Sequence, residues 1–382
     1  MSSREPSFHW FLPTGGDDRI LGRSSHGVGI GDGVPDNGAP SAHRPATLDY
    51  LTTLARAVDS LGYDGVLTPT GAHCEDAWLT TAALIAATRR VKFLVALRPG
   101  LLSPVLAAHM AGTFQRLSSG RLLLNVVIGS STAEQRGYGD PLDHDERYRR
   151  ADEFLAVVRR ALSGLPFDHY GTHYTVDGGL LREPPDPLPR VYFGGSSAPA
   201  LQVAARHADV YLTWGEPVAD VAEKIARVRE LAAEEGRDVR FGIRLHVITR
   251  DTSREAWDDA ARLIESLDDT TVRQRQAAMR RLESVGQRRM LDLHAGDRRG
   301  LVVAPNLWAG IGLVRGGAGT ALVGSHYEVA ERIDDYRAAG IDEFVFSGYP
   351  HLEEAYAFGE GVLPQFRSDE EIPDLLRSPS AS

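Results

Sequence analysis

Short apolar runs alternate along the chain with longer stretches whose apolar residues recur every three or four positions. The short runs are rich in β-branched and aromatic residues, which predicts strands, and the longer spacing predicts amphipathic helices. One such helical stretch carries Tyr148, Ala151, Leu155, Val158 and Leu162. Eight candidate strands cover residues 9–13, 65–69, 92–99, 122–129, 191–197, 210–214, 241–250 and 343–350.

The alternation of strands and helices predicts parallel strands that are joined by right-handed crossovers. Eight such units indicate an α/β protein with a (β/α)8 TIM barrel, and a doubly wound open sheet is the alternative. Neither a G-x-G-x-x-G motif after a strand nor a G-x-x-x-x-G-K-[ST] phosphate loop occurs. Their absence disfavours the open sheet, so we expect the barrel.

Three segments exceed what a minimal barrel needs, and we expect them to be insertions after strands 1, 4 and 7. Residues 14–45 are rich in glycine and proline, residues 165–190 predict a hairpin, and residues 251–324 predict at least two helices followed by GLVRGGAGTALVG. We see no domain linker. The chain should therefore form one domain over residues 1–366, followed by a flexible polar tail over residues 367–382.

The predicted strand FGIRLHVITR places two polar residues where a buried strand should be apolar. Its alternation puts Arg244 and His246 on one face, opposite a fully apolar face. In a barrel, that second face points into the interior, and active sites lie at the C-terminal ends of the strands. A buried arginine paired with a carboxylate is the alternative interpretation. We favour a site for an anion or for developing negative charge, because both residues lie near the catalytic end.

Other candidate residues carry weaker signals. The sequence GGSS at 194–197 precedes a helix and could hold a phosphate, although the same sequence also makes ordinary turns. His169 and His173 have the spacing of metal ligands on a helix, but the surrounding hairpin pattern favours structural histidines. Cys74 could be a nucleophile, although most lone cysteines are not.

Composition narrows the class of protein further. The net charge of -10 argues against broad binding to nucleic acid or to an anionic membrane. A single cysteine excludes an intrachain disulfide. No signal-length or membrane-length apolar run occurs, so we expect a cytoplasmic protein. The two lysines, Lys92 at a strand start and Lys224 on the polar side of a helix, disfavour Schiff-base chemistry.

Several long motifs resemble the alkanesulfonate monooxygenases of the bacterial luciferase-like flavin monooxygenases. The resemblance runs from WFLPT to about residue 365, through PTGAHCEDAW, KFLVALRP, VYFGGSS, YLTWGEP, RFGIRLHVI, NLWAGIGLVRGGAGTALVG and SGYPHLEEAY. It implies a (β/α)8 barrel that uses reduced FMN (FMNH2) and O2 to convert an alkanesulfonate to an aldehyde and sulfite. The implied partner is a separate NAD(P)H:FMN reductase. A homodimer or homotetramer is also expected.

The resemblance also assigns roles to residues, motif by motif. Arg315 would lie in a glycine-rich lid that closes over the substrate. The residues implied to line the active site are Cys74, Arg244, His246, Arg315, Tyr349 and His351. The residues implied to contact or border the flavin are Asn125, Gly129, Tyr148, Gly195, Ser196, Ser197 and Trp214.

Two positions depart from the family pattern. The family commonly has PTHGD after strand 1, whereas Gly15 stands here in PTGGD, and it commonly has threonine where this chain has Ile128. The first departure affects substrate scope, and the second removes a hydroxyl near the flavin. A deazaflavin-dependent oxidoreductase of the same superfamily is one alternative, and a flavin-binding barrel without turnover is another. Arg315 and the Arg244/His246 pair speak against the latter.

Overall fold

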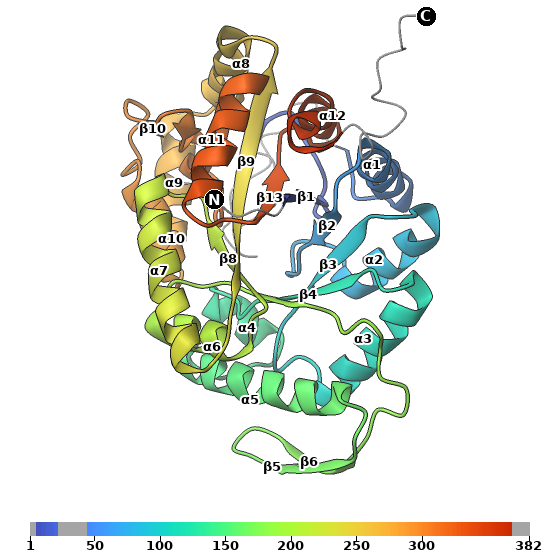
Figure 1. The fold of residues 1–382 in the computed structure, drawn as a ribbon. Coiled ribbons are helices and arrows are strands. Elements are labelled where there is room, and N and C mark those ends of the chain that lie inside the picture. The colour runs from blue at the N-terminus through green and yellow to red at the C-terminus, as the bar shows by residue number, and fades with distance from the viewer. Residues whose placement is uncertain (1–4, 22–43, 369–382) are drawn as a thin grey trace, which may run out of the picture.

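The computed structural model describes residues 5–21 and 44–368 (Figure 1). Within these residues, eight parallel strands follow one another around a ring, and the last pairs with the first. The predicted (β/α)8 barrel is therefore confirmed. Its strands are β1 (Ser7–Phe11), β2 (Gly65–Thr68), β3 (Lys92–Leu97), β4 (Leu122–Val126), β7 (Val191–Phe193), β8 (Val210–Trp214), β9 (Arg240–Arg250) and β13 (Glu343–Ser347).

A helix follows each barrel strand, and these helices surround the barrel (Figure 1). The first, α1 (Leu48–Leu61), begins where the Thr47 side chain accepts a hydrogen bond from the backbone N–H of Tyr50. It ends at Gly62, whose φ of 87° suits a residue without a Cβ atom. The others are α2 (Ala77–Leu84), α3 (Pro104–Ser118), α5 (His144–Leu162), α6 (Ala198–His207), α7 (Val218–Glu234), α11 (His326–Ala338) and α12 (His351–Gly361).

Side chains alternate between the barrel interior and the surface beneath the helices, as the two-residue period of a strand requires. On β9, Ile243 and Leu245 belong to the large core under the helices, whereas the Arg244 guanidinium carbon lies 4.2 Å from the ring centroid of Phe11. Arg244 therefore points inward, as predicted. A small interior cluster consists of Phe11, Leu67, Leu94, Leu123, Tyr192, Val210 and Val345.

A buried carboxylate organises the end of the barrel where the strands begin. Glu343 is fully buried and accepts hydrogen bonds from Tyr192 and from Arg190, at 2.7 Å for the latter. Arg240 lies 3.0 Å and His9 3.4 Å from the same carboxylate. Burial alone would raise the pKa of Glu343, but His9 and the two arginines hold it at about 2.

Two of the predicted insertions are folded as expected, and most of the first, residues 22–43, lies outside the described residues. The insertion at residues 165–190, after the fourth barrel strand, contains an antiparallel hairpin of β5 (Phe167–Tyr170) and β6 (Thr175–Gly179). The short helix α4 (Thr132–Gly137) precedes α5 and lies outside this insertion. The insertion after the seventh barrel strand, β9, contains α8 (Ser253–Glu265), α9 (Asp269–Arg280) and α10 (Val285–Asp292).

The third insertion also contains strands that the sequence pattern did not predict. These are β10 (Val302–Ala304), β11 (Leu307–Trp308) and β12 (Ala321–Ser325). Strand β12 pairs in parallel with the C-terminal half of β9, from Ala321 opposite His246 to Ser325 opposite Arg250. The C-terminal half of β9 therefore pairs with the insertion, while its N-terminal half, residues 240–244, pairs with β8 inside the barrel.

Lys224 corrects one expectation, because it is buried and does not lie on an exposed polar face. Its Nζ atom donates hydrogen bonds of 2.9 Å to Glu216 and of 2.9 Å to Thr213, which explains how a lysine is accommodated there. Of the predicted tail, only residues 367 and 368 are described, and Arg367 pairs with Asp64 at 2.6 Å. No helix in the described part of the chain is long and apolar enough to cross a membrane.

Candidate active site

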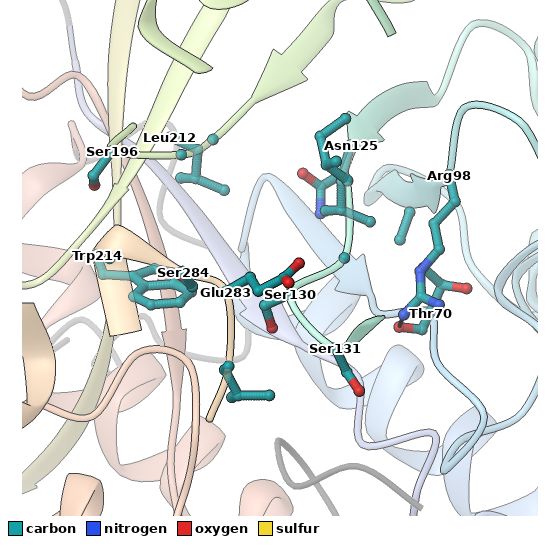
Figure 2. Close-up of a pocket in the computed structure, with 18 of the residues that line it drawn as sticks. Thr70, Arg98, Asn125, Ser130, Ser131, Ser196, Leu212, Trp214, Glu283 and Ser284 are labelled. Atoms are coloured by element: carbon teal, nitrogen blue, oxygen red, sulfur yellow. Dashed lines mark hydrogen bonds between the residues drawn. The ribbon is translucent and has the colours of Figure 1, made fainter. Parts of the chain in front are cut away.

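A cavity of about 340 Å³ lies at the C-terminal ends of the barrel strands. We call this cavity the pocket (Figure 2). Its walls come from the ends of β2, β3, β4, β7 and β8 and from residues 282–286. These residues span the end of the connection from α9 and the first two residues of α10, and we call them the strap. All the residues that the sequence assigned to the flavin line the pocket: Asn125, Gly129, Tyr148, Gly195, Ser196, Ser197 and Trp214.

The Gly-Ser turn after β7 is shaped to receive an anion. Ser197 caps α6 by accepting a hydrogen bond from the backbone of Ala200, so the positive end of this helix faces the pocket wall. A Cβ atom at Gly195 would lie 2.6 Å from the Cβ of Ala200 and 3.1 Å from the Tyr148 hydroxyl, so only glycine fits. Burial raises the pKa of Tyr148, so its hydroxyl stays neutral and can donate a hydrogen bond. These features fit a phosphate group.

The strap forms a wall of the pocket that the sequence analysis did not identify. The backbone N–H of Glu283 donates to the Ser130 carbonyl at 3.0 Å, and Figure 2 shows these two residues side by side. The Glu283 carboxylate accepts a hydrogen bond of 2.6 Å from Thr132 and one of 3.3 Å from Arg147. These hydrogen bonds hold the strap against the segment that follows β4.

Arg98 is a second lining residue that was not assigned a role from the sequence. It follows β3, is nearly buried, and pairs with Glu134 at 3.1 Å. His73 also lines the pocket, and burial lowers its pKa, so the ring is neutral. A charged residue directly after the apolar run KFLVAL was the signal that could have identified Arg98.

Beside the pocket lies a buried polar cluster from β9, β13 and the glycine-rich end of the third insertion. Arg244 lines the pocket and donates to the Ser347 hydroxyl at 3.1 Å. That hydroxyl lies 2.9 Å from Nδ1 of His246, whose Nε2 lies 3.2 Å from Arg315. The ring of Tyr349 stacks on His246 at 5.5 Å, and His351 meets Tyr349 edge to face at 5.4 Å. Five of the six predicted active-site residues are thus together.

The cluster holds two arginines without a matching negative charge. Arg244 and Arg315 are each 6% exposed, and neither pairs with a carboxylate in the described part of the chain. Burial, and then the charge of Arg315, lowers the pKa of His246 and of His351 well below the usual range. Both histidines are therefore neutral. The alternative of a carboxylate-paired arginine at position 244 is wrong for the described residues, and an anionic ligand would supply the missing charge.

Cys74, the sixth predicted residue, lies apart from the cluster. Its Sγ atom lies 3.4 Å from the Gly71 carbonyl oxygen, and burial raises the pKa of the thiol to about 11. A neutral thiol is a poor nucleophile. Ile128, one of the two departures from the family pattern, lines the pocket with an apolar side chain.

The fold is a (β/α)8 barrel with a pocket at the C-terminal ends of its strands, beside a cluster of two arginines that have no carboxylate partner among the described residues. Residues 9–343 match the family described as luciferase-like monooxygenase, and the chain belongs to that family.

Solved structures share the fold over almost the whole chain. A riboflavin lyase with modified FMN and riboflavin is 21% identical with a TM-score of 0.77, and the match covers 97% of this chain and 92% of that one. EDTA monooxygenase from Chelativorans sp. BNC1 is 20% identical with a TM-score of 0.72, covering 97% and 95%. An F420-dependent secondary alcohol dehydrogenase is 16% identical with a TM-score of 0.66, covering 96% and 100%.

Proposed function

We propose that this protein is a two-component monooxygenase that uses reduced FMN and O2 to convert alkanesulfonates to aldehydes and sulfite. The observation that carries the proposal is the pair of buried arginines, Arg244 and Arg315, without a carboxylate partner among the described residues. A sulfonate is a permanent anion with three acceptor oxygens, which matches the planar donors of two guanidinium groups.

The chemistry of the pocket residues supports FMN as the cofactor. Ser196, Ser197 and the neutral hydroxyl of Tyr148 would hold the phosphate at the start of α6, and Asn125 and Trp214 would border the ring system. Bound reduced FMN would supply the electrons that activate oxygen. Arg244 would bind the sulfonate from the pocket side. Arg315 would bind it from the glycine-rich segment and exclude water.

The neutral histidines suit this chemistry. His246 and His351 lie beside two cations and, as neutral rings, can accept or donate a hydrogen bond without adding a third positive charge. Negative charge that develops during the reaction would be stabilised by Arg244 and Arg315 in a buried site, where electrostatic interactions are strong.

Sulfite release from short and long alkanesulfonates, with photoreduced FMN and O2, tests the proposal. We expect release for at least one chain length. We also expect that the purified chain with FMN, sulfonate and NADH or NADPH does not turn over until a flavin reductase is added, because the strands of the described residues belong to the barrel and its insertions and form no separate dinucleotide-binding sheet. Hydride transfer with reduced deazaflavin, without oxygen uptake, would instead favour the F420-type alternative. Flavin binding with no turnover would favour the non-catalytic barrel.

A further inference from the structure

Arg315 is held by a tight loop that folds back on His246. The Ala318 carbonyl oxygen lies 3.1 Å from Nε2 of His246 and 3.3 Å from Nη1 of Arg315. Gly317, in the middle of this loop, has a φ of 83°, which a glycine adopts without strain. The position of the Arg315 guanidinium therefore depends on what holds residues 315–318 in place.

Gln287 in the first turn of α10 holds this loop from outside. Its side chain is 2% exposed, and its Oε1 atom accepts a hydrogen bond of 2.8 Å from the backbone N–H of Gly317. The Gln287 backbone N–H in turn donates to the Ser284 hydroxyl, which caps the helix, at 3.1 Å. The side chain that reaches the Arg315 loop therefore belongs to a well-defined helical turn.

The same helical turn also forms part of the pocket. Ser284, Val285 and Gly286 line the pocket. A Cβ atom on Gly286 would lie 3.2 Å from the Trp214 ring and 3.6 Å from the Ser196 hydroxyl. One turn of α10 is therefore in contact with the pocket on one side and with the Arg315 loop on the other.

The remainder of α10 is fixed to the barrel by charge. Arg289 makes hydrogen bonds of 2.9 Å and 3.1 Å from Nε and one of 2.5 Å from Nη2 to the buried carboxylate of Glu216. Glu216 is also the partner of Lys224. A bidentate arginine–carboxylate contact restricts the helix to one orientation, so a change at its first turn is passed to the Arg315 loop and not absorbed by movement of the helix.

We propose that Gln287 is a positioning residue that sets the place of Arg315 and links it to the occupancy of the pocket. The link to FMN and sulfonate rests on the proposed function, whereas the effect on the loop itself does not. A ligand that packs against Ser284 and Gly286 would restrict the motion of the first turn of α10. The hydrogen bond from Gly317 to Gln287 would then restrict the motion of the Arg315 loop as well.

Gln287→Met tests this proposal, because methionine keeps the length of the side chain and removes the acceptor. Gln115→Met is the matched control. Gln115 is a buried glutamine (3% exposed) that accepts from the Leu122 backbone at 2.7 Å and donates to the Pro187 carbonyl at 2.8 Å, at the opposite end of the barrel. Both variants lose a buried bond in which the glutamine accepts from a backbone N–H; Gln287 also loses a 3.8 Å contact to Met279 Sδ, and Gln115 loses its bond to the Pro187 carbonyl. A general loss of stability should therefore be at least as large in the control.

Backbone hydrogen exchange by mass spectrometry supplies the first readout, on the chain without ligand. We expect faster exchange over residues 315–320 in Gln287→Met and unchanged exchange there in Gln115→Met. Addition of oxidised FMN should slow exchange over residues 282–288 in all three proteins. It should slow exchange over residues 315–320 only in the wild type and in Gln115→Met.

Calorimetric binding of octanesulfonate to the FMN-saturated chain supplies the second readout. We expect affinity that is roughly 5- to 10-fold weaker in Gln287→Met, as for the loss of one hydrogen bond. Affinity in Gln115→Met should not change. Unchanged exchange over residues 315–320 in the ligand-free Gln287→Met protein would overturn the positioning role. Failure of the wild type to bind FMN or octanesulfonate would overturn the proposed function and leave the exchange result standing.

Discussion

At the scale of single residues, Arg244 and Arg315 oppose folding and prepare the site for a ligand at the same time. Two guanidinium groups that are 6% exposed lose most of their hydration, and no carboxylate in the described chain compensates for it. The partial compensation comes from Ser347, from backbone carbonyls and from the face of the Phe11 ring. An anion that enters between them should therefore raise stability as well as bind.

Replacement of Arg315 by alanine separates these two effects. We expect kcat/KM for sulfite release to fall by roughly 10- to 100-fold, since a charge-assisted hydrogen bond is removed. Affinity for FMN should stay within a few-fold, because Arg315 does not line the pocket. The Tm without ligand should be equal or higher, because a buried cation is gone. Arg299→Ala, at a side chain that is 91% exposed, is the control, and unchanged sulfite release in Arg315→Ala would contradict the assigned role.

Cys74, unlike Arg315, is expected not to be required for turnover. Burial raises the pKa of its thiol to about 11, so the group is neutral at neutral pH, and its sulfur contacts the carbonyls of Pro69 and Gly71. Cys74→Ala should therefore keep measurable turnover, and alkylation of the wild-type thiol by iodoacetamide should be slow at neutral pH. Complete loss of turnover in a folded, flavin-binding Cys74→Ala protein would mean that the thiol takes part in the reaction.

Residues differ in how far the sequence predicts them. The alternation in β9 was enough to place Arg244 and His246 inside, because a strand has only two faces. The same reasoning failed for Lys224, because helical spacing reports which face is apolar but does not reveal that Glu216 supplies a buried partner. A pairing between residues on different elements leaves no periodic signal.

At the scale of elements, the strap controls one side of the pocket. The hydrogen bond from Thr132 lowers the pKa of Glu283; partial burial acts against this, and Arg147 adds to the lowering. A carboxyl group whose pKa is lowered on folding stabilises the folded contact above its unfolded pKa, and this contribution is lost as the pH falls through the folded pKa. The strap should thus be fastened at neutral pH and loosen only in acid.

Glu283→Ala should release this fastening. We expect FMN to dissociate several-fold faster by stopped-flow fluorescence, as for the loss of one or two partly exposed hydrogen bonds. The dissociation rate in the wild type should rise in acid toward that of the variant. Glu234→Ala, at an exposed position near the end of α7, is the control. Equal dissociation rates in wild type and Glu283→Ala at neutral pH would exclude a fastening role.

Elements with strong periodicity were predictable, and short connecting elements were not. The eight barrel strands and the hairpin of β5 and β6 follow from runs of alternating or apolar residues. The strap has no period of its own, and β12 lies within a glycine-rich stretch that predicts a loop. These two elements owe their structure to tertiary pairing with the segment after β4 and with β9.

At the scale of the whole molecule, stability and function lie at opposite ends of the barrel. The end where the strands begin holds Glu343 between the cations Arg190 and Arg240, with His9 beside it. The other end holds Arg244 and Arg315, which have no carboxylate partner among the described residues, so the network around Glu343 offsets the destabilisation that these arginines cause.

Glu343→Gln tests the anchoring network. A pKa held at about 2 against 4.5 for the free group corresponds to roughly 3 kcal/mol of stability at neutral pH. This contribution is complete above the unfolded pKa and is lost as the pH falls toward the folded pKa. We expect Glu343→Gln to unfold at lower urea concentration at pH 7, with a smaller difference from wild type at pH 3. An equal difference at both pH values would show that hydrogen bonding, and not charge, provides the stabilisation.

The double use of β9 has a consequence for how such proteins diversify. Its residues up to His246 pair within the ring, with β8 and β13, whereas residues 246–250 pair with β12. The segment 253–325 is thus attached to the part of the strand that projects past the ring. This segment can be lengthened, shortened or replaced during evolution without a change in the strand pairs that close the barrel. Because segment 253–325 carries both Gln287 and Arg315, a single exchange would transfer the arginine proposed to bind the substrate together with the residue proposed to position it.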